Sequence, residues 1–176
     1  TYFITVVFLV FAQNIVSAEG VLLLESNTTN GSTIFTDSSG KNHSFTIQGQ
    51  THHSTYTSKF GSSSIEFDGN SDALVVNHSD FNFGTSDFTI NLWFSYRNTG
   101  DAFHTLVGTH AASGSGEGFN FGVLNGHIYL YARFGDGSHP LTTAGLSGSS
   151  SIDPETWHHT ALVTHGNTLN VYLDGQ

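Results

Sequence analysis

The sequence contains no cysteine and no methionine, and among its 176 residues only two are proline and four are basic. Without cysteine the chain cannot form a disulfide, a thiolate zinc site or a cysteine nucleophile. Fourteen acidic residues give it a net charge of −10. Nucleic-acid binding requires a basic stripe that displaces counterions, so we expect no nucleic-acid partner. The charge instead favours a cation such as calcium, or simply keeps the protein in solution.

Small polar residues and aromatic residues make up much of the chain. Hydrophobic residues account for 37 % and aromatic residues for 13 %, whereas charged residues account for 10 %. This composition can fill a core and does not resemble a disordered acidic tail. The length suits one domain. The abundant Ser, Thr, Asn and Gly are typical of the outer faces of β-rich extracellular domains.

The first eighteen residues differ from the rest. The stretch "FITVVFLVFA" (3–12) is almost uninterruptedly apolar, and "VSA" (16–18) places small residues where signal peptidase cleaves. We therefore predict a secretory signal peptide at 1–18, N-terminally incomplete because it lacks a basic segment, and a secreted or cell-surface domain at 19–176. The apolar run is short for a membrane span, so we expect membrane contact only during export. The alternative for 1–18 is a buried first strand.

From residue 20 onward, short strand-like runs alternate with clusters of Gly, Ser, Asn and Asp. This pattern predicts an all-β protein, an antiparallel β-sandwich of the jelly-roll type. One helical turn near 153–156 is the exception, because Pro154 suits a first helical position. The "LNG" at 124–126 predicts an Asn-Gly hairpin turn, and "HGN" at 165–167 a second hairpin. We expect strands at 21–24, 44–48, 64–67, 74–76, 88–96, 104–109, 118–124, 127–134, 157–165 and 168–173.

Strict alternation in these runs predicts which side chains point inward. In "FTINLWFSY" (88–96) every second residue, starting with Phe88, is apolar. The aliphatic positions of 127–134 and 168–174 alternate in the same way, and we assign them to the sandwich core. The residues on the opposite face of each of these runs are a mixture of aromatic and polar side chains. Trp157 shares a face with Ala161 and Val163, which favours a core position for it.

Several blocks together carry a family resemblance: "SKFGSSSIEFDGNSDAL", "DFNFGTSDFTINLWF" and "TWHHTALVTHGNTLNVYLDGQ", preceded by "NGSTIFTDSSGKNHSFTIQG". They resemble the concanavalin A-like lectin/glucanase superfamily, and more narrowly its LamG-like jelly-roll branch, over about residues 20–176. The resemblance implies a convex and a concave antiparallel sheet, used outside the cell to bind glycans or proteins. Family members continue beyond the Y-L-D-G block with further strands. The resemblance therefore predicts a domain that lacks its C-terminal strands.

The stretch "IEFDGNSDALVV" (65–76) concentrates three carboxylates, which raises glycoside hydrolysis as a function. Glucanases of this superfamily carry E-x-D-x-E or E-x-D-x-x-E on one strand. Glu66 and Asp68 fit the start of this motif, but Asn70 and Ser71 occupy the places of the third acid. No G-x-S-x-G elbow suggests a serine hydrolase either. We predict that the protein is not an enzyme and that the block is a β-turn.

The same turn is a candidate calcium site. Carboxylate and amide oxygens in a tight loop are typical calcium ligands, and Asp68, Asn70 and Asp72 supply them. The alternative is that Asp68 caps the turn by accepting backbone N–H groups. In LamG-like domains calcium lies at the sandwich rim with ligands from separate loops, which by resemblance could include Asp72 or Asp80. The His pairs at 52–53 and 158–159 point to opposite faces of a strand and form no ready zinc clamp.

Sugar recognition requires aromatic faces with hydrogen-bonding groups beside them. The mixed faces supply such residues, provided that their strands are neighbours: Trp93, Tyr129, Tyr131, Arg133, Asn170 and Tyr172. Loops that cover this face would instead make the aromatic residues a second small core. We predict a secreted, non-catalytic module that binds carbohydrate or a surface glycoprotein as part of a larger extracellular protein. The alternatives are a structural or adhesive spacer and a glucanase-related hydrolase.

Overall fold

The structure is a computed structural model that describes residues 2–5, 11–12, 19–83, 86–97, 103–109, 118–133, 144–166 and 168–176. Regular structure in this part of the chain is β-strand, apart from one 3-10 turn, η1, at Ser79–Phe81. No helix in these ranges is long and apolar enough to cross a membrane. The strands are β1 (Tyr2–Thr5), β2 (Phe11–Ala12), β3 (Glu19–Gly20), β4 (Thr46–Gln48), β5 (His52–Ser54), β6 (Ser64–Phe67), β7 (Ala73–Val75), β8 (Thr89–Tyr96), β9 (His104–Gly108), β10 (Gly118–Leu124), β11 (His127–Arg133), β12 (Ala144–Ser147), β13 (His158–His165) and β14 (Thr168–Leu173).

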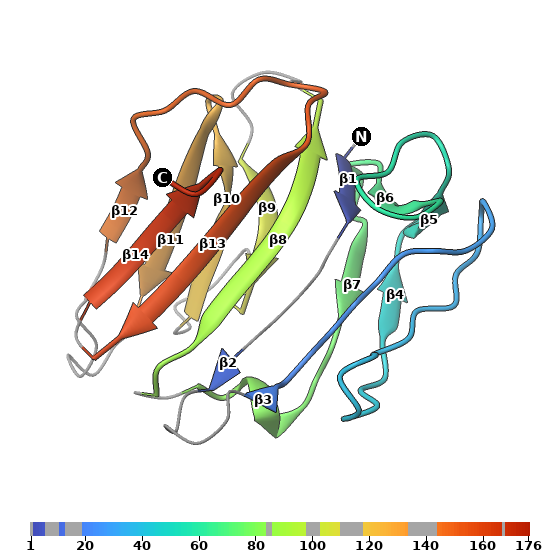
Figure 1. Ribbon diagram of the computed structural model, residues 1–176, viewed down its shortest axis with the longest axis horizontal. Helices are drawn as coiled ribbons and strands as arrows, with labels where there is room; N and C mark the ends of the chain where they lie inside the picture. The colour runs from blue at the N-terminus through green and yellow to red at the C-terminus, as the bar shows by residue number, and fades with distance from the viewer. Residues whose placement is uncertain are drawn as a thin grey trace.

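Two antiparallel sheets form the body of the molecule. One has six strands in the order β14-β13-β8-β1-β6-β5, and the other has four in the order β12-β11-β10-β9. Figure 1 shows β14, β13 and β8 side by side, with β9 to β12 as the layer behind them. Two small ribbons, β2-β3 and β4-β7, complete the described strands. The predicted all-β antiparallel sandwich is confirmed.

The core lies between these two sheets, as the alternation predicted. Phe88 and its alternate neighbours in β8 are all buried, and Phe94 is fully so. Phe88 stacks on Phe119 of the facing sheet with ring centroids 6.3 Å apart. The remaining residues of β8, Thr89, Asn91, Trp93 and Ser95, face away from the core, because successive side chains of a strand point to opposite sides. Fifteen buried hydrophobic residues form one cluster: Val21, Leu24, Ile65, Phe88, Ile90, Leu92, Phe94, Tyr96, Phe119, Phe121, Val123, Ile128, Leu130, Ile152 and Leu162.

The predicted turn at 124–126 is confirmed. Asn125 and Gly126 both have positive φ, 51° and 75°, and connect β10 to β11. This is the backbone that a two-residue hairpin of the favoured hand requires. The predicted helical turn at 153–156 is wrong. Glu155 there has φ 60° and donates its N–H to the carbonyl of Tyr96, so the segment is a turn fastened to the sheet.

The segment 21–24 contributes buried side chains without forming the predicted strand. Its one ladder contact is an isolated bridge between Leu24 and Asp37. The N–H of Leu23 donates to the carboxylate of Asp37 at 3.1 Å. A side chain therefore satisfies a donor that a neighbouring strand would otherwise pair, which explains the difference.

Residues within the predicted signal peptide form a strand of the larger sheet. β1 lies between β6 and β8, with Tyr2 in register with both Phe67 and Tyr96. This is the placement that the alternative, a first strand, describes. A cleaved signal and a sheet strand are mutually exclusive fates of the same residues, and cleavage after Ala18 stays a prediction.

Candidate functional site

The six residues predicted to form a sugar-binding face divide between the two sheets. Trp93, Asn170 and Tyr172 lie on β8 and β14 of the six-stranded sheet, whereas the other three lie on β11 of the four-stranded sheet. In each of these strands, the residues that alternate with the predicted ones point into the core between the two sheets. Trp93, Asn170 and Tyr172 therefore point outward on one side of the sandwich, and Tyr129 and Tyr131 point outward on the other. The condition attached to the prediction, that these strands are neighbours, is not met for the whole set, because sequence alternation gives a residue's side of its own strand but not which sheet holds that strand.

A loop covers part of the Trp93 side. The ammonium group of Lys59 lies 3.9 Å from the centroid of the Trp93 ring, and Phe60 meets that ring edge-on at 5.8 Å. His159 of the neighbouring strand β13 lies 5.3 Å from it. Trp93 is consequently half-buried in a small aromatic cluster outside the main core. This is the second small core that the sequence left open as the alternative.

Trp157 belongs to the same outer layer. It is half-buried, and its indole N–H donates to the Thr57 hydroxyl at 3.1 Å. The next residue, His158, takes the core position on this strand, followed by Thr160 and Leu162. The core assignment of Trp157 is therefore wrong, because the strand faces the core with the opposite set.

The β11 side presents two tyrosines in a row. Tyr129 and Tyr131 are both half-buried, and the Phe103 ring meets that of Tyr129 edge-on at 5.6 Å. On the adjacent strand β10, Gly122 pairs with Tyr129 and Asn120 pairs with Tyr131. Residues paired across strands share a face, so the tyrosines have a glycine and an amide beside them.

Arg133 pairs in register with Gly118 at the end of β11. Its side chain lies outside the part of the chain whose side chains the structure describes. Gly122 admits no side chain, because a Cβ there would collide with the carbonyl of His104 on β9. The ladder is irregular at this point, with a register shift between Phe121 and Gly122.

The carboxylates of the predicted calcium turn accept backbone hydrogen bonds. Asp68 Oδ1 accepts the N–H of Asn70 at 2.6 Å. Asp72 Oδ2 accepts the N–H of Asp68 at 2.8 Å, and its Oδ1 accepts the N–H of Gln50 at 2.5 Å. Gly69 and Ser71 complete the turn with positive φ. The capping role predicted as the alternative for Asp68 is confirmed, and calcium at Asp68, Asn70 and Asp72 stays a prediction.

Glu66 faces a histidine rather than a second acid in the described contacts. It pairs in register with His52 across β5 and β6, and the two side chains approach to 3.8 Å. The neighbouring Asp68 is engaged by the turn. Retaining glycosidases hold two carboxyl groups about 5–5.5 Å apart with room for a sugar between them. The local arrangement thus resembles a cross-strand pair more than an acid/base couple.

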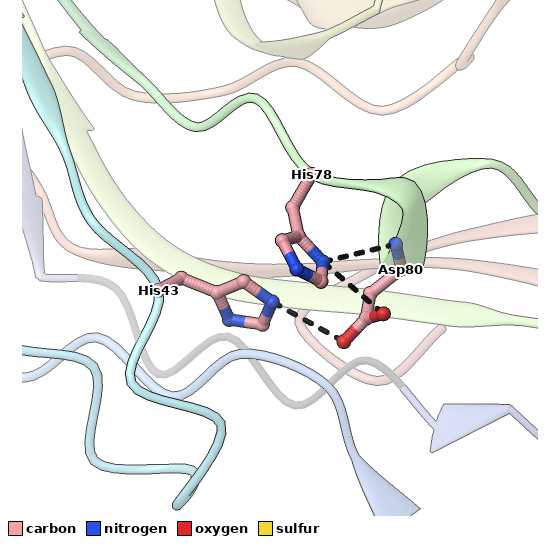
Figure 2. Close-up of side chains that lie close together, drawn as sticks. All are labelled: His43, His78 and Asp80. Carbon is pink, nitrogen blue, oxygen red and sulfur yellow. Dashed lines mark hydrogen bonds and ion pairs between the residues drawn. The ribbon is translucent and has the colours of Figure 1, made fainter.

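Three side chains of the types that ligate metals converge where the turn after Asp37 meets η1. His43, His78 and Asp80 each offer one ligand atom, and these atoms lie within 4.8 Å of one another. Figure 2 shows both imidazoles directed at the Asp80 carboxylate, with His43 coming from a separate segment of the chain. His43 is buried, Asp80 is half-buried and His78 is exposed.

The buried side of this group is anchored by Asp37. The Nδ1 atom of His43 lies 2.8 Å from Asp37 Oδ2, and both side chains are almost completely buried. The Asp37 carboxylate also accepts N–H groups from Leu23, Ser39 and His43. Burial acts to raise the pKa of Asp37, but the hydrogen bonds from Ser39, His43 and Leu23 outweigh it and hold the pKa well below its usual range.

Sequence reasoning missed this group as a unit. Asp80 appeared as a candidate rim ligand, and "DSSGKNH" (37–43) contributed to the family resemblance, but 37 residues separate His43 from Asp80. The available signal was "HSD" at 78–80, where the His78 side chain accepts the N–H of Asp80 as the N-cap of η1. Nothing local in that motif identifies the distant histidine.

Comparison with known families agrees with the fold. A sequence model of the laminin G type, described as the concanavalin A-like lectin/glucanases superfamily, matches residues 67–176, more than half of the chain. No curated protein and no solved structure matches the chain. The matched segment includes β8, the whole four-stranded sheet and the β13–β14 hairpin. This membership supports a carbohydrate-binding type of module. The chain belongs to the concanavalin A-like lectin/glucanase superfamily.

Proposed function

We propose that this domain is a secreted, non-catalytic module that binds carbohydrate, either free or on an extracellular glycoprotein. The observation that carries the proposal is the pair Tyr129 and Tyr131 on the outer face of the four-stranded sheet. Superfamily membership supports carbohydrate as the ligand class, and the exposed edges of the two tyrosines support this face as its binding place.

The geometry of the pair suits a short stretch of sugar chain. Alternate residues of a strand are roughly 7 Å apart, so two tyrosine rings can contact neighbouring sugar rings. Sugar C–H faces pack on aromatic rings, and polar groups nearby fix the orientation. Asn120 supplies an amide next to Tyr131, and Gly122 keeps the surface beside Tyr129 low. Both tyrosines are half-buried, and Phe103 contacts Tyr129, so their side chains are partly restricted before binding, which reduces the entropy cost.

The state of the acidic residues supports the non-catalytic part of the proposal. Asp68 and Asp72 hold backbone N–H groups of their own turn, and Glu66 faces His52. A proton donor for glycoside hydrolysis would require a carboxyl group available to the glycosidic oxygen. Positions 70 and 71, where the glucanases of the superfamily carry the third acid, hold Asn and Ser.

The test is glycan-array screening of the full chain, followed by calorimetric titration of the best ligand. Tyr131→Ala should weaken binding at least tenfold, because it removes a stacking ring. Tyr172→Ala is the matched control, since it removes a partly exposed tyrosine from the opposite outer face. Unchanged affinity in Tyr131→Ala would overturn the assignment of this face.

The two alternatives have distinct readouts. Release of reducing sugar from β-glucan that is lost in Glu66→Gln would contradict the non-catalytic part of the proposal. Absence of glycan binding, together with extended particles in electron micrographs, would favour a structural spacer instead.

A further inference from the structure

The convergence of His43, His78 and Asp80 has no role in the sugar-binding proposal and does not depend on it. His43 lies outside the segment that matches the superfamily, whereas the other two lie within it. We propose that these three side chains bind one Zn²⁺ ion. The site has two imidazole ligands, one carboxylate ligand and a solvent-facing side.

The hydrogen bonding of His43 leaves a lone pair aimed at Asp80. Because its Nδ1 lies 2.8 Å from the Asp37 carboxylate, which can only accept, the ring carries a proton on Nδ1. In the neutral ring Nε2 is then an acceptor, and it lies 3.3 Å from Asp80 Oδ2, which is also an acceptor. Two acceptors at this distance require a second proton on the ring or a cation between them.

The same conflict occurs on the other side of Asp80. His78 Nδ1 accepts the backbone N–H of Asp80 at 3.3 Å, so in that hydrogen bond it uses a lone pair rather than a proton. This nitrogen also lies 3.1 Å from Asp80 Oδ1. A single cation relieves both contacts if His78 exchanges its long hydrogen bond from the Asp80 N–H for a bond from Nδ1 to the metal.

The distances agree with tetrahedral zinc. Zinc binds imidazole nitrogen and carboxylate oxygen at about 2.0–2.2 Å, which places neighbouring ligand atoms about 3.3 Å apart around a tetrahedron. The separations of 3.3 Å from His43 Nε2 to Asp80 Oδ2 and of 3.1 Å from His78 Nδ1 to Asp80 Oδ1 lie close to this value. The three ligand atoms all lie within 4.8 Å of one another, so an ion would draw the two imidazoles closer together on binding.

Asp37 supplies the outer contact that zinc-bound histidines regularly have. A metal-ligating histidine usually donates its other ring N–H to a carboxylate, which fixes the tautomer and makes the ring a better ligand. Asp37 is held in place by N–H groups from three residues. The orientation of His43 is therefore set before any ion binds.

The ligand set discriminates between metals. Calcium and magnesium prefer six or more oxygen ligands, whereas two imidazoles suit zinc and other late transition metals. Three protein ligands leave a fourth position, and His78, with 52 % of its side chain exposed, lies on the solvent side. A water molecule or a ligand oxygen can complete the coordination there.

Zinc at this position would fasten two distant segments. It would link the turn at 37–43 to η1, whose Phe81 ring lies 5.0 Å from the His43 ring. Phe81 contacts Phe83, and Phe83 stacks on the core residue Phe88. The ion would consequently stabilise the packing of the N-terminal loop against the sandwich.

The experiment uses the full chain without an affinity tag, stripped with a chelator and titrated with ZnCl₂ by calorimetry. We expect one Zn²⁺ per chain with a Kd in the micromolar range or below. Co²⁺ should give visible d–d bands of tetrahedral intensity that Zn²⁺ abolishes, and millimolar Ca²⁺ or Mg²⁺ should not compete. Failure to bind Zn²⁺, or displacement of Zn²⁺ by Ca²⁺, would overturn the proposal.

The variants are chosen so that folding is not in question. His78→Ala and Asp80→Asn change partly exposed side chains, and each should weaken Zn²⁺ binding at least tenfold. His165→Ala is the matched control: His165 also pairs with an aspartate, Asp87, at 2.8 Å, and belongs to no described metal-binding group. Equal affinity in His78→Ala, or an equal loss in His165→Ala, would show adventitious binding by surface histidines and reject the site.

Discussion

Asp72 accepts the backbone N–H of Gln50 at 2.5 Å, across 22 residues of sequence. The same carboxylate holds the N–H of Asp68. The turn at 68–72 is thus fastened both to itself and to the β4–β5 connection. Two of the three carboxylates that suggested hydrolysis or calcium, Asp68 and Asp72, accept backbone hydrogen bonds of this turn.

Asp72→Ala should lower the free energy of unfolding by about 2 kcal/mol, because it removes two hydrogen bonds to a charged group. Asn70→Ala should change it by less than about 0.5 kcal/mol, since the exposed Asn70 contributes its backbone N–H to the described hydrogen bonds of the turn. Urea denaturation with and without calcium measures both effects. Stabilisation by calcium that disappears in both variants would instead establish the predicted calcium site.

His53 should make the protein acid-sensitive near neutral pH. Its ring is buried, with Nε2 donating to the Ile34 carbonyl at 3.0 Å and Nδ1 accepting from the Ser26 hydroxyl at 2.6 Å. Burial lowers the pKa of His53 below its ordinary value, despite the hydrogen bond to Ile34, which acts to raise the pKa. Below about pH 6.5 the unfolded chain therefore binds a proton that the native ring resists.

The contribution of His53 to stability is fully present above the pKa that its ring has in the unfolded chain. It is lost as the pH falls through the lower pKa that the ring has in the folded protein. We expect the free energy of unfolding to fall with a slope of up to about 1.4 kcal/mol per pH unit for this one group. His104 adds to the slope with the same sign, because burial also lowers its pKa. His53→Gln should flatten the slope between pH 7 and 5. A pH-independent wild type would contradict this account.

Trp93 should act on stability and on the docking of the 55–62 loop. Trp93→Ala removes the ring under Lys59 and Phe60, and should lower the free energy of unfolding by about 2 kcal/mol. The freed loop should be cut by trypsin after Lys59 faster than in the wild type. Tyr172→Ala, on the same outer face but partly exposed, is the control. Unchanged proteolysis in Trp93→Ala would show that the loop is held by its hydrogen bonds, such as those from Trp157 to Thr57 and from Ser62 to Asn27.

Removal of residues 1–18 should expose the strands on either side of β1. β6 and β8 both pair with β1, so each would lose hydrogen-bond partners along one edge. We expect faster hydrogen exchange at Ser95 and Glu66, which pair with Phe3, and larger species in size-exclusion chromatography, because unpaired edges recruit other strands. Amides of the β13–β14 hairpin serve as the internal control. Slow exchange and a monomer after removal would agree with the signal-peptide prediction and show that the sheet does not need β1.

The sequence predicted the fold through features that are local. Alternation in 88–96 assigned the buried face of β8 correctly, because a strand's two sides are set by its own pleat. The Asn125-Gly126 turn was predictable for the same reason, since few residues tolerate its backbone.

Tertiary structure alone decided what the polar residues do. It placed Trp93 and Tyr131 on opposite outer faces, since sheet membership depends on pairing between distant strands. It directed the Asp72 carboxylate to the backbone N–H of Gln50, and it brought His43 to Asp80 across 37 residues. Side-chain alternation and turn chemistry act over a few residues and can be inferred from the chain itself. The meeting of two loops depends on how the whole sandwich closes, and no short stretch of sequence encodes it.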